Sequence, residues 1–320
     1  MPTPPAVRLV FMGTPEFACP ALLRLAQLPA PYFIAGVYSQ PPRQRGRGMR
    51  LTKSPTHHLA ESLSLSVFTP PRLDEAAITQ LKALAPDILV VVAYGLILPD
   101  AVLGIPRLCA INAHASLLPK WRGAAPIERA IAAGDQVTGV TLMRITKKLD
   151  SGPILAKAKI PIAATDTGGS LHDTLAKLAA DMLAQHIPSI VAGEASETRQ
   201  NESAASYAHK INDDDTRLDF DLPKQQVLAS IRAFAPRPGA WCIDLTPPQR
   251  RLMILSAEAA EGVGKAGECP GQCLGRGKRG GIVLATSDGA IEVMAIKPAG
   301  KAVMSAADYL NGNPLPKILP

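Results

Sequence analysis

Largely apolar runs alternate with amphipathic segments through the first part of the chain. The runs at 7–12, 32–38 and 87–93 predict buried strands, and the segments 16–27 and 75–84 predict helices. Strands that are apolar on both faces and alternate with helices are typical of a mostly parallel sheet covered by helices on each side. The pattern therefore predicts an α/β, Rossmann-like architecture.

The α/β pattern continues to about residue 190 and then changes. Segments 139–145 and 154–162 predict two more strands, and 173–187 predicts an amphipathic helix that closes the domain. The polar segment 194–206 has no apolar periodicity, which is typical of a linker.

After this linker the chain has a β-rich texture. Short strands are predicted at 250–255, 281–286 and 289–295, separated by Gly-rich turns, which favours a small β-barrel. The expected boundaries are 1–194 for the first domain, 195–208 for the linker and 209–320 for the second domain.

Composition narrows the class of protein. With 320 residues, 47% hydrophobic and 19% charged, the chain has the composition of a globular protein long enough for two domains. Its longest apolar run, 88–98, is too short to span a bilayer, and residues 1–8 lack the apolar core of a signal peptide. We therefore expect a cytoplasmic protein with no membrane partner.

The cysteines give no sign of a disulfide framework. There are five, an odd number, which fits a reducing compartment. Cys269 and Cys273 have the spacing of half a metal site, but the sequence offers neither a second pair nor a nearby histidine. We expect a structural or incidental role for these two residues, and no metal.

A cationic loop at 40–53 interrupts the α/β pattern. It contains five basic and no acidic residues, and the whole chain carries a formal charge of +7. A solvated surface loop is one interpretation. Because like charges repel each other, binding a polyanion would relieve the repulsion, and we favour that interpretation. The basic residues of the loop are Arg43, Arg45, Arg47, Arg50 and Lys53.

Two polar side chains follow the apolar run 108–111. Asn112 and His114 are separated by one residue, so in a strand they point to the same face. An amide and an imidazole at a strand end can direct donors at a carbonyl oxygen that becomes negative during reaction. Asp150, in a predicted loop, can favour the charged imidazole if the fold brings the two together. Taken singly, each residue also fits a turn or a buried histidine.

The first predicted strand ends at Gly13-Thr14-Pro15. This is not the G-x-G-x-x-G fingerprint, so a dinucleotide site is only weakly supported despite the Rossmann-like pattern. A dinucleotide-dependent oxidoreductase is therefore disfavoured.

The residues around Asn112, His114 and Asp150 resemble a known family. From Asn112 the chain reads N-x-H-x-S-L-L-P-x-x-R-G-x-x-P-I, followed by Thr138-Gly139-Val140-Thr141 and Leu149-Asp150-Ser151-Gly152. These motifs resemble the 10-formyltetrahydrofolate-dependent formyltransferase superfamily. The Gly-Arg-Gly of the basic loop and the C-terminal segments 207–210 and 297–301 resemble the branch that formylates methionyl-tRNA.

The resemblance implies a fold and a reaction. The fold is a Rossmann-like formyltransferase domain followed by a β-barrel resembling an OB fold that binds tRNA. The reaction moves the formyl group of 10-formyltetrahydrofolate to the free amine of methionyl initiator tRNA, for translation initiation. Folate and this tRNA are the implied partners, and we expect a monomer.

The resemblance also assigns roles to residues. Asn112, His114 and Asp150 match the catalytic trio of the family. The segment that binds tetrahydrofolate corresponds to Ser116, Leu117, Leu118 and Pro119. Contacts with the tRNA are expected from Arg43, Arg45, Arg47, Phe17 and Lys210.

In the implied reaction the amine attacks the formyl carbon. We expect Asn112 to donate a hydrogen bond to the formyl oxygen as it becomes an oxyanion, and His114 to protonate the departing folate nitrogen. Asp150 accepts the proton lost by the amine, directly or through water. This scheme requires no metal.

Two alternatives stay open. A related formyltransferase acting on a small amine, such as a nucleotide-linked aminosugar or a purine precursor, would share the trio but needs neither the basic loop nor the second domain. A non-catalytic RNA-binding protein on a Rossmann-like scaffold would need no intact trio.

Overall fold

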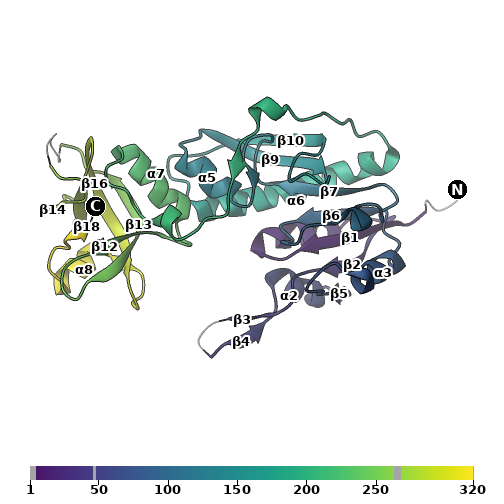
Figure 1. Ribbon diagram of the computed structural model, residues 1–320, viewed down its shortest axis with the longest axis horizontal. Coiled ribbons are helices and arrows are strands. Elements are labelled where there is room, and N and C mark those ends of the chain that lie inside the picture. Colours follow the sequence, from purple (N-terminus) through teal and green to yellow (C-terminus); the bar gives the residue numbers. More distant parts are fainter. Residues whose placement is uncertain (1–4, 46–47, 263–267, 320) are drawn as a thin grey trace. The chain divides into compact units, whose positions relative to one another are not determined.

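The chain forms two compact units in the computed structural model, which describes residues 5–45, 48–262 and 268–319. The first unit comprises Met1–Gly123, Thr138–Ile160 and His172–Tyr207, and the second comprises Ala124–Val137, Pro161–Leu171 and Ala208–Pro320. Figure 1 shows the elements of both units.

A seven-stranded sheet forms the centre of the first unit. Its strands β1, β2, β5, β6 and β7 are parallel, and β9 runs antiparallel to β7. The sheet therefore confirms the predicted α/β class with a mostly parallel core. In spatial order the strands are β10 (Ile154–Pro161), β9 (Val137–Arg144), β7 (Cys109–His114), β6 (Ile88–Val92), β1 (Val7–Gly13), β2 (Tyr32–Tyr38) and β5 (Val67–Phe68).

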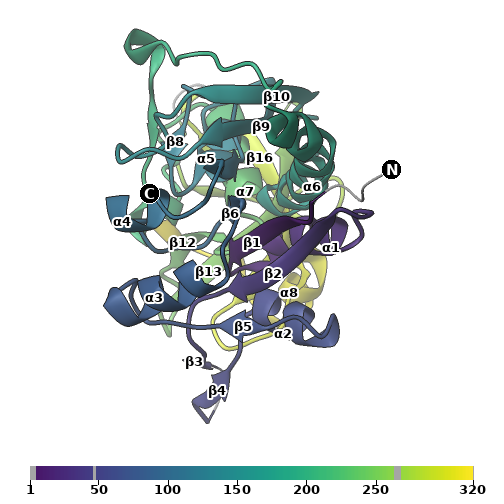
Figure 2. The same cartoon turned by 90° about the vertical axis from the view of Figure 1, so that its right-hand side faces the viewer.

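Helices cover both faces of this sheet (Figure 2). An ion pair of 3.4 Å between Arg24 and Asp181 joins α1 and α6 on one face. On the other face, Leu81 of α3 and Val102 of α4 pack into one apolar cluster with Val10 and Val91 of the strands. The helices are α1 (Cys19–Ala26), α2 (Pro55–Ser62), α3 (Glu75–Ala83), α4 (Asp100–Leu103) and α6 (Gly168–Ala192).

Local sequence signals explain where these helices begin. Ser54 accepts a hydrogen bond from the backbone N–H of His57 at the start of α2, and Asp74 accepts one from Ala77 at the start of α3. The predicted helix 16–27 is divided into the 3₁₀ turn η1 (Glu16–Ala18) and α1, because Pro20 fits only the first turn of an α-helix.

The cationic loop contains regular structure that the sequence did not predict. β3 (Arg43–Arg45) and β4 (Arg50–Thr52) pair antiparallel and form a hairpin that projects from the sheet (Figure 1). Arg47 lies outside the described residues. Lys53 pairs with Glu61 at 2.6 Å, so this cation is already neutralised within the protein.

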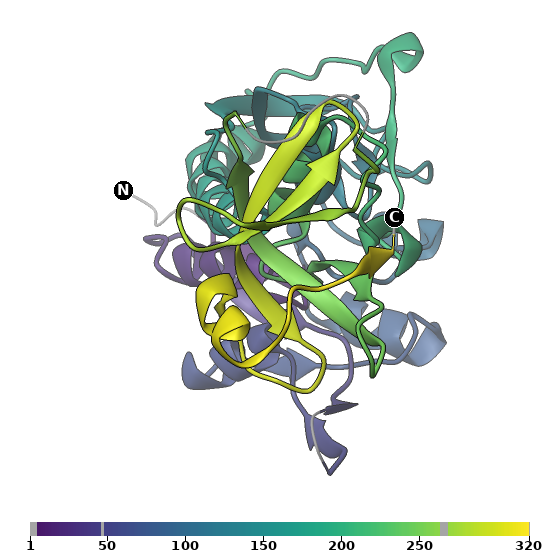
Figure 3. The ribbon, with the colours of Figure 1, turned by 90° about the vertical axis from the view of Figure 1, so that its left-hand side faces the viewer.

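The second unit contains a mainly antiparallel sheet (Figure 3). The predicted strands at 250–255, 281–286 and 289–295 are confirmed, although β13 and β16 are longer than expected. Among the described residues the strand order leaves β14 and β18 at opposite ends, so closure into a barrel stays a prediction. The strands are β12 (Ala240–Asp244), β13 (Arg250–Ala259), β14 (Cys273–Arg276), β15 (Ile282–Thr286), β16 (Gly289–Pro298), β17 (Met304–Ser305) and β18 (Ile318–Leu319).

Three helices complete the second unit. α5 packs on α7, and α7 packs on β13 of the sheet. Their apolar residues, among them Ile131, Val227 and Ile231, are almost fully buried. The helices are α5 (Pro126–Ala132), α7 (Lys224–Phe234) and α8 (Ala306–Gly312). In the described part of the chain, no helix has the length and apolar character needed to cross a bilayer.

Candidate active site

Strand β7 positions the first two members of the predicted trio. It lies between β6 and β9, so its backbone is held by hydrogen bonds on both sides. Asn112 is opposite Met143 of β9, and His114 is opposite Thr141. His114 is only 6% exposed, whereas Asn112 is half-buried. Both side chains project from one face at the carboxyl edge of the sheet, where ligands bind in open α/β folds.

Asp150 reaches the imidazole of His114 from the loop after β9. Its Oδ2 lies 3.7 Å from Nδ1 of His114 and accepts a hydrogen bond of 2.8 Å from the backbone N–H of Gly123. The fold therefore brings the three predicted residues together. The side chains of His114 and Asp150 are 7% and 11% exposed, so little solvent screens the attraction between them.

The second ring nitrogen of His114 has a protein partner as well. Nε2 lies 2.8 Å from the carbonyl oxygen of Trp121. Because a carbonyl oxygen only accepts, Nε2 carries a hydrogen. Sequence reasoning missed this contact, since it depends on a backbone atom.

Two residues around the histidine have left-handed backbones. Trp121 has φ 62° and Asp150 has φ 46°. A bulky residue at positive φ is strained, and such strain persists only where the surrounding structure holds it. Here it directs the Trp121 carbonyl to one side of the imidazole and the Asp150 carboxylate to the other.

The amide of Asn112 is available to a ligand. It has no hydrogen-bond partner among the residues that the structure describes, although most buried polar groups in proteins are paired. An amide N–H that is held at a strand end, two residues from the imidazole of His114, is suited to stabilise an oxyanion.

The predicted folate segment is a compact turn. Ser116 and Leu118 are fully buried, and the hydroxyl of Ser116 donates to the carbonyl of Lys120 at 2.6 Å. Thr141 Oγ1 donates to the carbonyl of Ser116 and accepts from the N–H of Leu118. Only Leu117 and Pro119 are partly exposed. Thr141, which the Thr-Gly-Val-Thr motif contains, is thus a supporting residue that sequence reasoning did not assign.

The other predicted site residues lie on different elements. Phe17 is in η1, is 7% exposed and packs edge-on against His172, with the ring centroids 5.2 Å apart. Arg43 and Arg45 belong to β3, and the guanidinium of Arg43 donates to the side chain of Gln40. Lys210 is exposed in the second unit.

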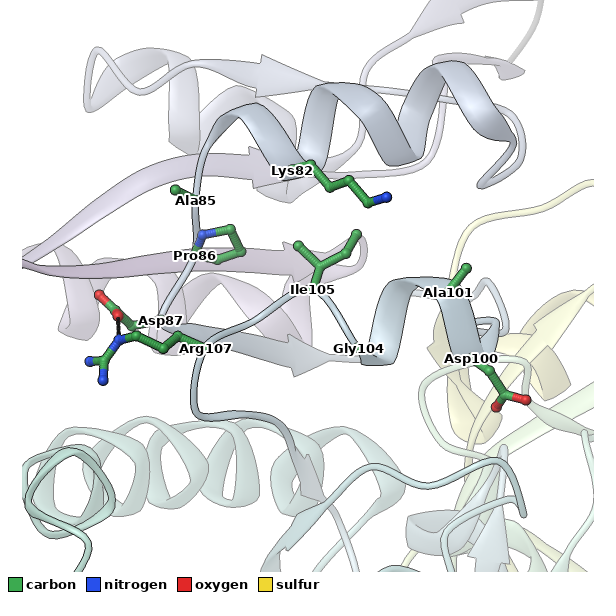
Figure 4. Close-up of a pocket in the computed structure, with 9 residues that line it drawn as sticks. All are labelled: Lys82, Ala85, Pro86, Asp87, Asp100, Ala101, Gly104, Ile105 and Arg107. Atoms are coloured by element: carbon green, nitrogen blue, oxygen red, sulfur yellow. Dashed lines mark hydrogen bonds and ion pairs between the residues drawn. The ribbon is translucent and has the colours of Figure 1, made fainter.

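A large pocket lies at the opposite edge of the sheet (Figure 4). Its volume is about 540 Å³, and Asp87 and Arg107 in its lining precede the amino ends of β6 and β7. Asp87 is already paired with Arg107 at 2.5 Å and accepts from the N–H of Arg8. Asp87 and Arg107 precede the amino ends of their strands, whereas His114 is the last residue of β7, so this pocket is not the reaction site.

The described residues contain no cluster of three His, Cys, Asp or Glu side chains that could hold a metal ion. All five cysteines are free thiols, including Cys269 and Cys273.

Comparison with known families identifies the class of protein. Residues 7–187 match the model of the formyl transferase family, and residues 210–314 match that of the formyl transferase C-terminal domain. The chain belongs to the formyl transferase family.

Methionyl-tRNA formyltransferases are among its curated relatives. A methionyl-tRNA formyltransferase of Halorhodospira halophila is 46% identical over 310 residues, which is 97% of each chain. Another from Sinorhizobium medicae is 43% identical and also covers 97% of each chain.

Solved structures share the fold at low sequence identity. HypX from Aquifex aeolicus in complex with tetrahydrofolic acid is 17% identical, with a TM-score of 0.62 over 95% of this chain and 46% of that one. An N-formyltransferase from Helicobacter canadensis is 18% identical, with a TM-score of 0.63 over 92% of this chain and 100% of that one.

Proposed function

We propose that this protein transfers the formyl group of 10-formyltetrahydrofolate to the amine of methionyl initiator tRNA. The observation that carries the proposal is the intact Asn112, His114 and Asp150 site in a chain 46% identical to a methionyl-tRNA formyltransferase over 97% of its length. The same relatives confirm the family resemblance that the sequence motifs indicated. They also disfavour the alternatives of an RNA-binding protein without activity and of an oxidoreductase.

Asn112, His114 and Asp150 divide the chemistry between them. As the amine attacks the formyl carbon, the amide of Asn112 donates to the oxygen that becomes negative, which lowers the barrier by about 3 kcal/mol. The carboxylate of Asp150 stabilises positive charge on His114 and accepts the proton lost by the amine. The C–N bond to the folate then breaks, and the folate nitrogen gains a proton.

The observed contacts of His114 constrain its role. Both of its ring nitrogens face protein oxygens, at 2.8 Å for Trp121 and 3.7 Å for Asp150. The imidazolium therefore acts first through its charge. To protonate the folate nitrogen, Nε2 must leave the Trp121 carbonyl.

In this proposal the formyl donor binds to apolar residues at the carboxyl edge of the sheet, the edge at which Asn112 also lies. Hydrogen bonds with Thr141 hold Ser116 and Leu118 in the interior of the turn. The accessible surface of the turn therefore belongs to Leu117 and Pro119. Ile97, in the loop after β6, is 89% exposed at the same edge of the sheet. Apolar side chains of this kind pack on flat ring systems. We assign this surface to the pterin of the donor.

The tRNA is bound by the hairpin and the second unit. The hairpin provides the exposed side chains of Arg43 and Arg50. The proposal also includes Arg45 and Arg47, which lie between these two in the sequence, and Phe17, near the methionyl group. In this proposal residues 1–194 are the catalytic domain, 195–208 the linker and 209–320 a tRNA-binding domain related to the OB fold. Lys210 lies at the start of that domain. The enzyme acts as a cytoplasmic monomer.

Purified protein should formylate initiator methionyl-tRNA and leave elongator methionyl-tRNA unchanged. The measurement is transfer of labelled formyl from 10-formyltetrahydrofolate to each acylated tRNA. Methionine alone and a nucleotide-linked aminosugar serve as controls for the small-amine alternative. Transfer to neither tRNA would reject the proposed function, and efficient transfer to the aminosugar would replace it.

Removing two hairpin cations should weaken tRNA use and spare folate use. In the variant Arg43→Ala/Arg50→Ala, the KM for tRNA rises, and the slope of log KM against log salt falls by about 1 for each phosphate that the hairpin no longer neutralises. The KM for the folate stays within about twofold. Arg72→Ala is the matched control, since Arg72 is an exposed arginine of the same unit that pairs with Asp74. An unchanged salt slope would exclude the hairpin from tRNA binding.

A further inference from the structure

A fully buried arginine lies next to the catalytic loops. Arg122 is 0% exposed and follows Trp121 directly. Glu202 accepts two hydrogen bonds from its guanidinium, at 2.7 and 3.2 Å. Hydrogen bonds from Arg122 and Lys148 lower the pKa of Glu202 to about 2, so the carboxylate stays charged. A buried charge of this kind needs further partners.

Gln200 supplies these partners and uses its whole amide to do so. Its Oε1 accepts from Nε and Nη2 of Arg122, at 3.1 and 2.8 Å. Its Nε2 donates to the backbone carbonyls of Asp150 and Gly152, at 2.8 and 2.9 Å. An amide has two N–H donors and one oxygen with two lone pairs, so the group is fully satisfied.

Only one orientation of this amide is possible. Turned over, its oxygen would face the carbonyls of Asp150 and Gly152, and its NH₂ would face the guanidinium of Arg122. A carboxylate at the same place would satisfy the arginine but repel the two carbonyls. The chemistry of the position therefore requires a glutamine side chain.

Gln200 thereby joins the two loops that hold His114. One loop contains Trp121, whose carbonyl contacts Nε2, and continues through Arg122 to Gly123, whose N–H binds the carboxylate of Asp150. The other loop contains Asp150 itself, with its strained φ of 46°. The side-chain amide of Gln200 donates to the carbonyls of Asp150 and Gly152, on either side of Ser151, and so holds Asp150 in this backbone conformation.

We propose that Gln200 is a positioning residue for Asp150, and through it for the charge and orientation of His114. The inference rests on the proposed formyl transfer and deepens it. Gln200 touches no substrate. It belongs to the polar segment that the sequence predicts to be a linker, although this segment is part of the first unit and pairs with it at Thr198 and Ser206.

Steady-state kinetics of two variants test this role. Gln200→Ala removes the hydrogen bonds both to Arg122 and to the carbonyls of Asp150 and Gly152, whereas Gln200→Glu keeps acceptors for Arg122 and loses the donors to the loop. Both variants should lower kcat about 10- to 100-fold, because a misplacement of about 1 Å can cost 100-fold. The KM values for folate and tRNA should stay within about threefold. Asn201→Ala is the matched control, since the side chain of the exposed Asn201 bonds only to Ser203 among the described residues, and this variant should retain wild-type kcat.

A double-mutant cycle separates positioning from a general effect on folding. In the Asp150→Ala background, Gln200→Ala should cause less than about a threefold further loss, because its effect acts through Asp150. Hydrogen exchange of the Gly123 amide, measured without substrate, should quicken in Gln200→Ala and stay unchanged in Asn201→Ala.

Several results would overturn the proposal. One is a kcat within about threefold of wild type in both Gln200→Ala and Gln200→Glu. Another is a loss of kcat on adding Gln200→Ala to Asp150→Ala that is as large as the loss in the wild-type background. The third is a wild-type kcat for the Gln200 variants once activity is expressed per folded molecule. Wild-type turnover is measured in the same assay. If wild type transfers no formyl group, the proposed function has failed, and the exchange of the Gly123 amide still decides whether Gln200 holds the loop.

Discussion

Asn112→Ala should lower kcat by about 10²- to 10³-fold, the effect typical of removing one donor to an oxyanion. Asn112 has no other partner among the described residues, so the substitution removes the donor and little else. Thermal unfolding should therefore change only slightly. The measurement is single-turnover transfer of labelled formyl at saturating folate and tRNA.

Asn112→Asp separates the donor from the shape of the side chain. The two side chains have the same size, but an aspartate offers negative charge where the oxyanion forms. We expect it to be at least as inactive as the alanine variant. Near-normal turnover by either variant would remove Asn112 from the chemistry.

Gly152→Ala should damage the site through the backbone. A Cβ at this position would lie 1.8 Å from the carbonyl oxygen of Arg144, and a hydrogen bond of 2.9 Å from the Arg144 N–H to Pro153 holds the two segments at this spacing. The loop that contains Asp150 must move. We expect kcat to fall about 100-fold and the free energy of unfolding to fall by about 1–3 kcal/mol.

Gly104→Ala provides the matched control for this change. At Gly104 the nearest atom to an added Cβ is the carbonyl oxygen of Asp100, at 3.6 Å, and φ is −84°. That variant should keep its activity and its stability. Equal kinetics for Gly152→Ala and Gly104→Ala would show that the close approach to Arg144 does not constrain the catalytic loop.

The longer strands of the first unit and its helices α1, α3 and α6 follow from local patterns. The predicted strand 32–38 coincides with β2, and 87–93 contains β6. Apolar runs predict buried strands because a parallel sheet covered on both faces has no polar side. The hairpin of β3 and β4 was missed because a run of Arg, Gln and Gly carries no period-2 apolar signal.

The polar segment around Gln200 shows where pattern reasoning ends. Low hydrophobicity and an absence of periodicity predict a linker, yet Glu197, Gln200 and Glu202 each bind an arginine of the first unit. A polar residue that forms hydrogen bonds with a buried partner contributes to the local composition in the same way as a polar residue exposed to solvent. Only the partner distinguishes them, and the partner is remote in sequence.

The sequence by itself determined the family, the α/β class and the placement of Asn112 and His114 on one face, because a strand has a period of two. The tertiary structure decided how these residues act. It set the Asp150 carboxylate and the Trp121 carbonyl on either side of the imidazole and left the amide of Asn112 without a protein partner among the described residues. These relations depend on contacts between residues 27 to 78 positions apart, such as Gly123 with Asp150 and Arg122 with Gln200. No local pattern encodes such contacts, because each is formed by loops that only the completed sheet brings together.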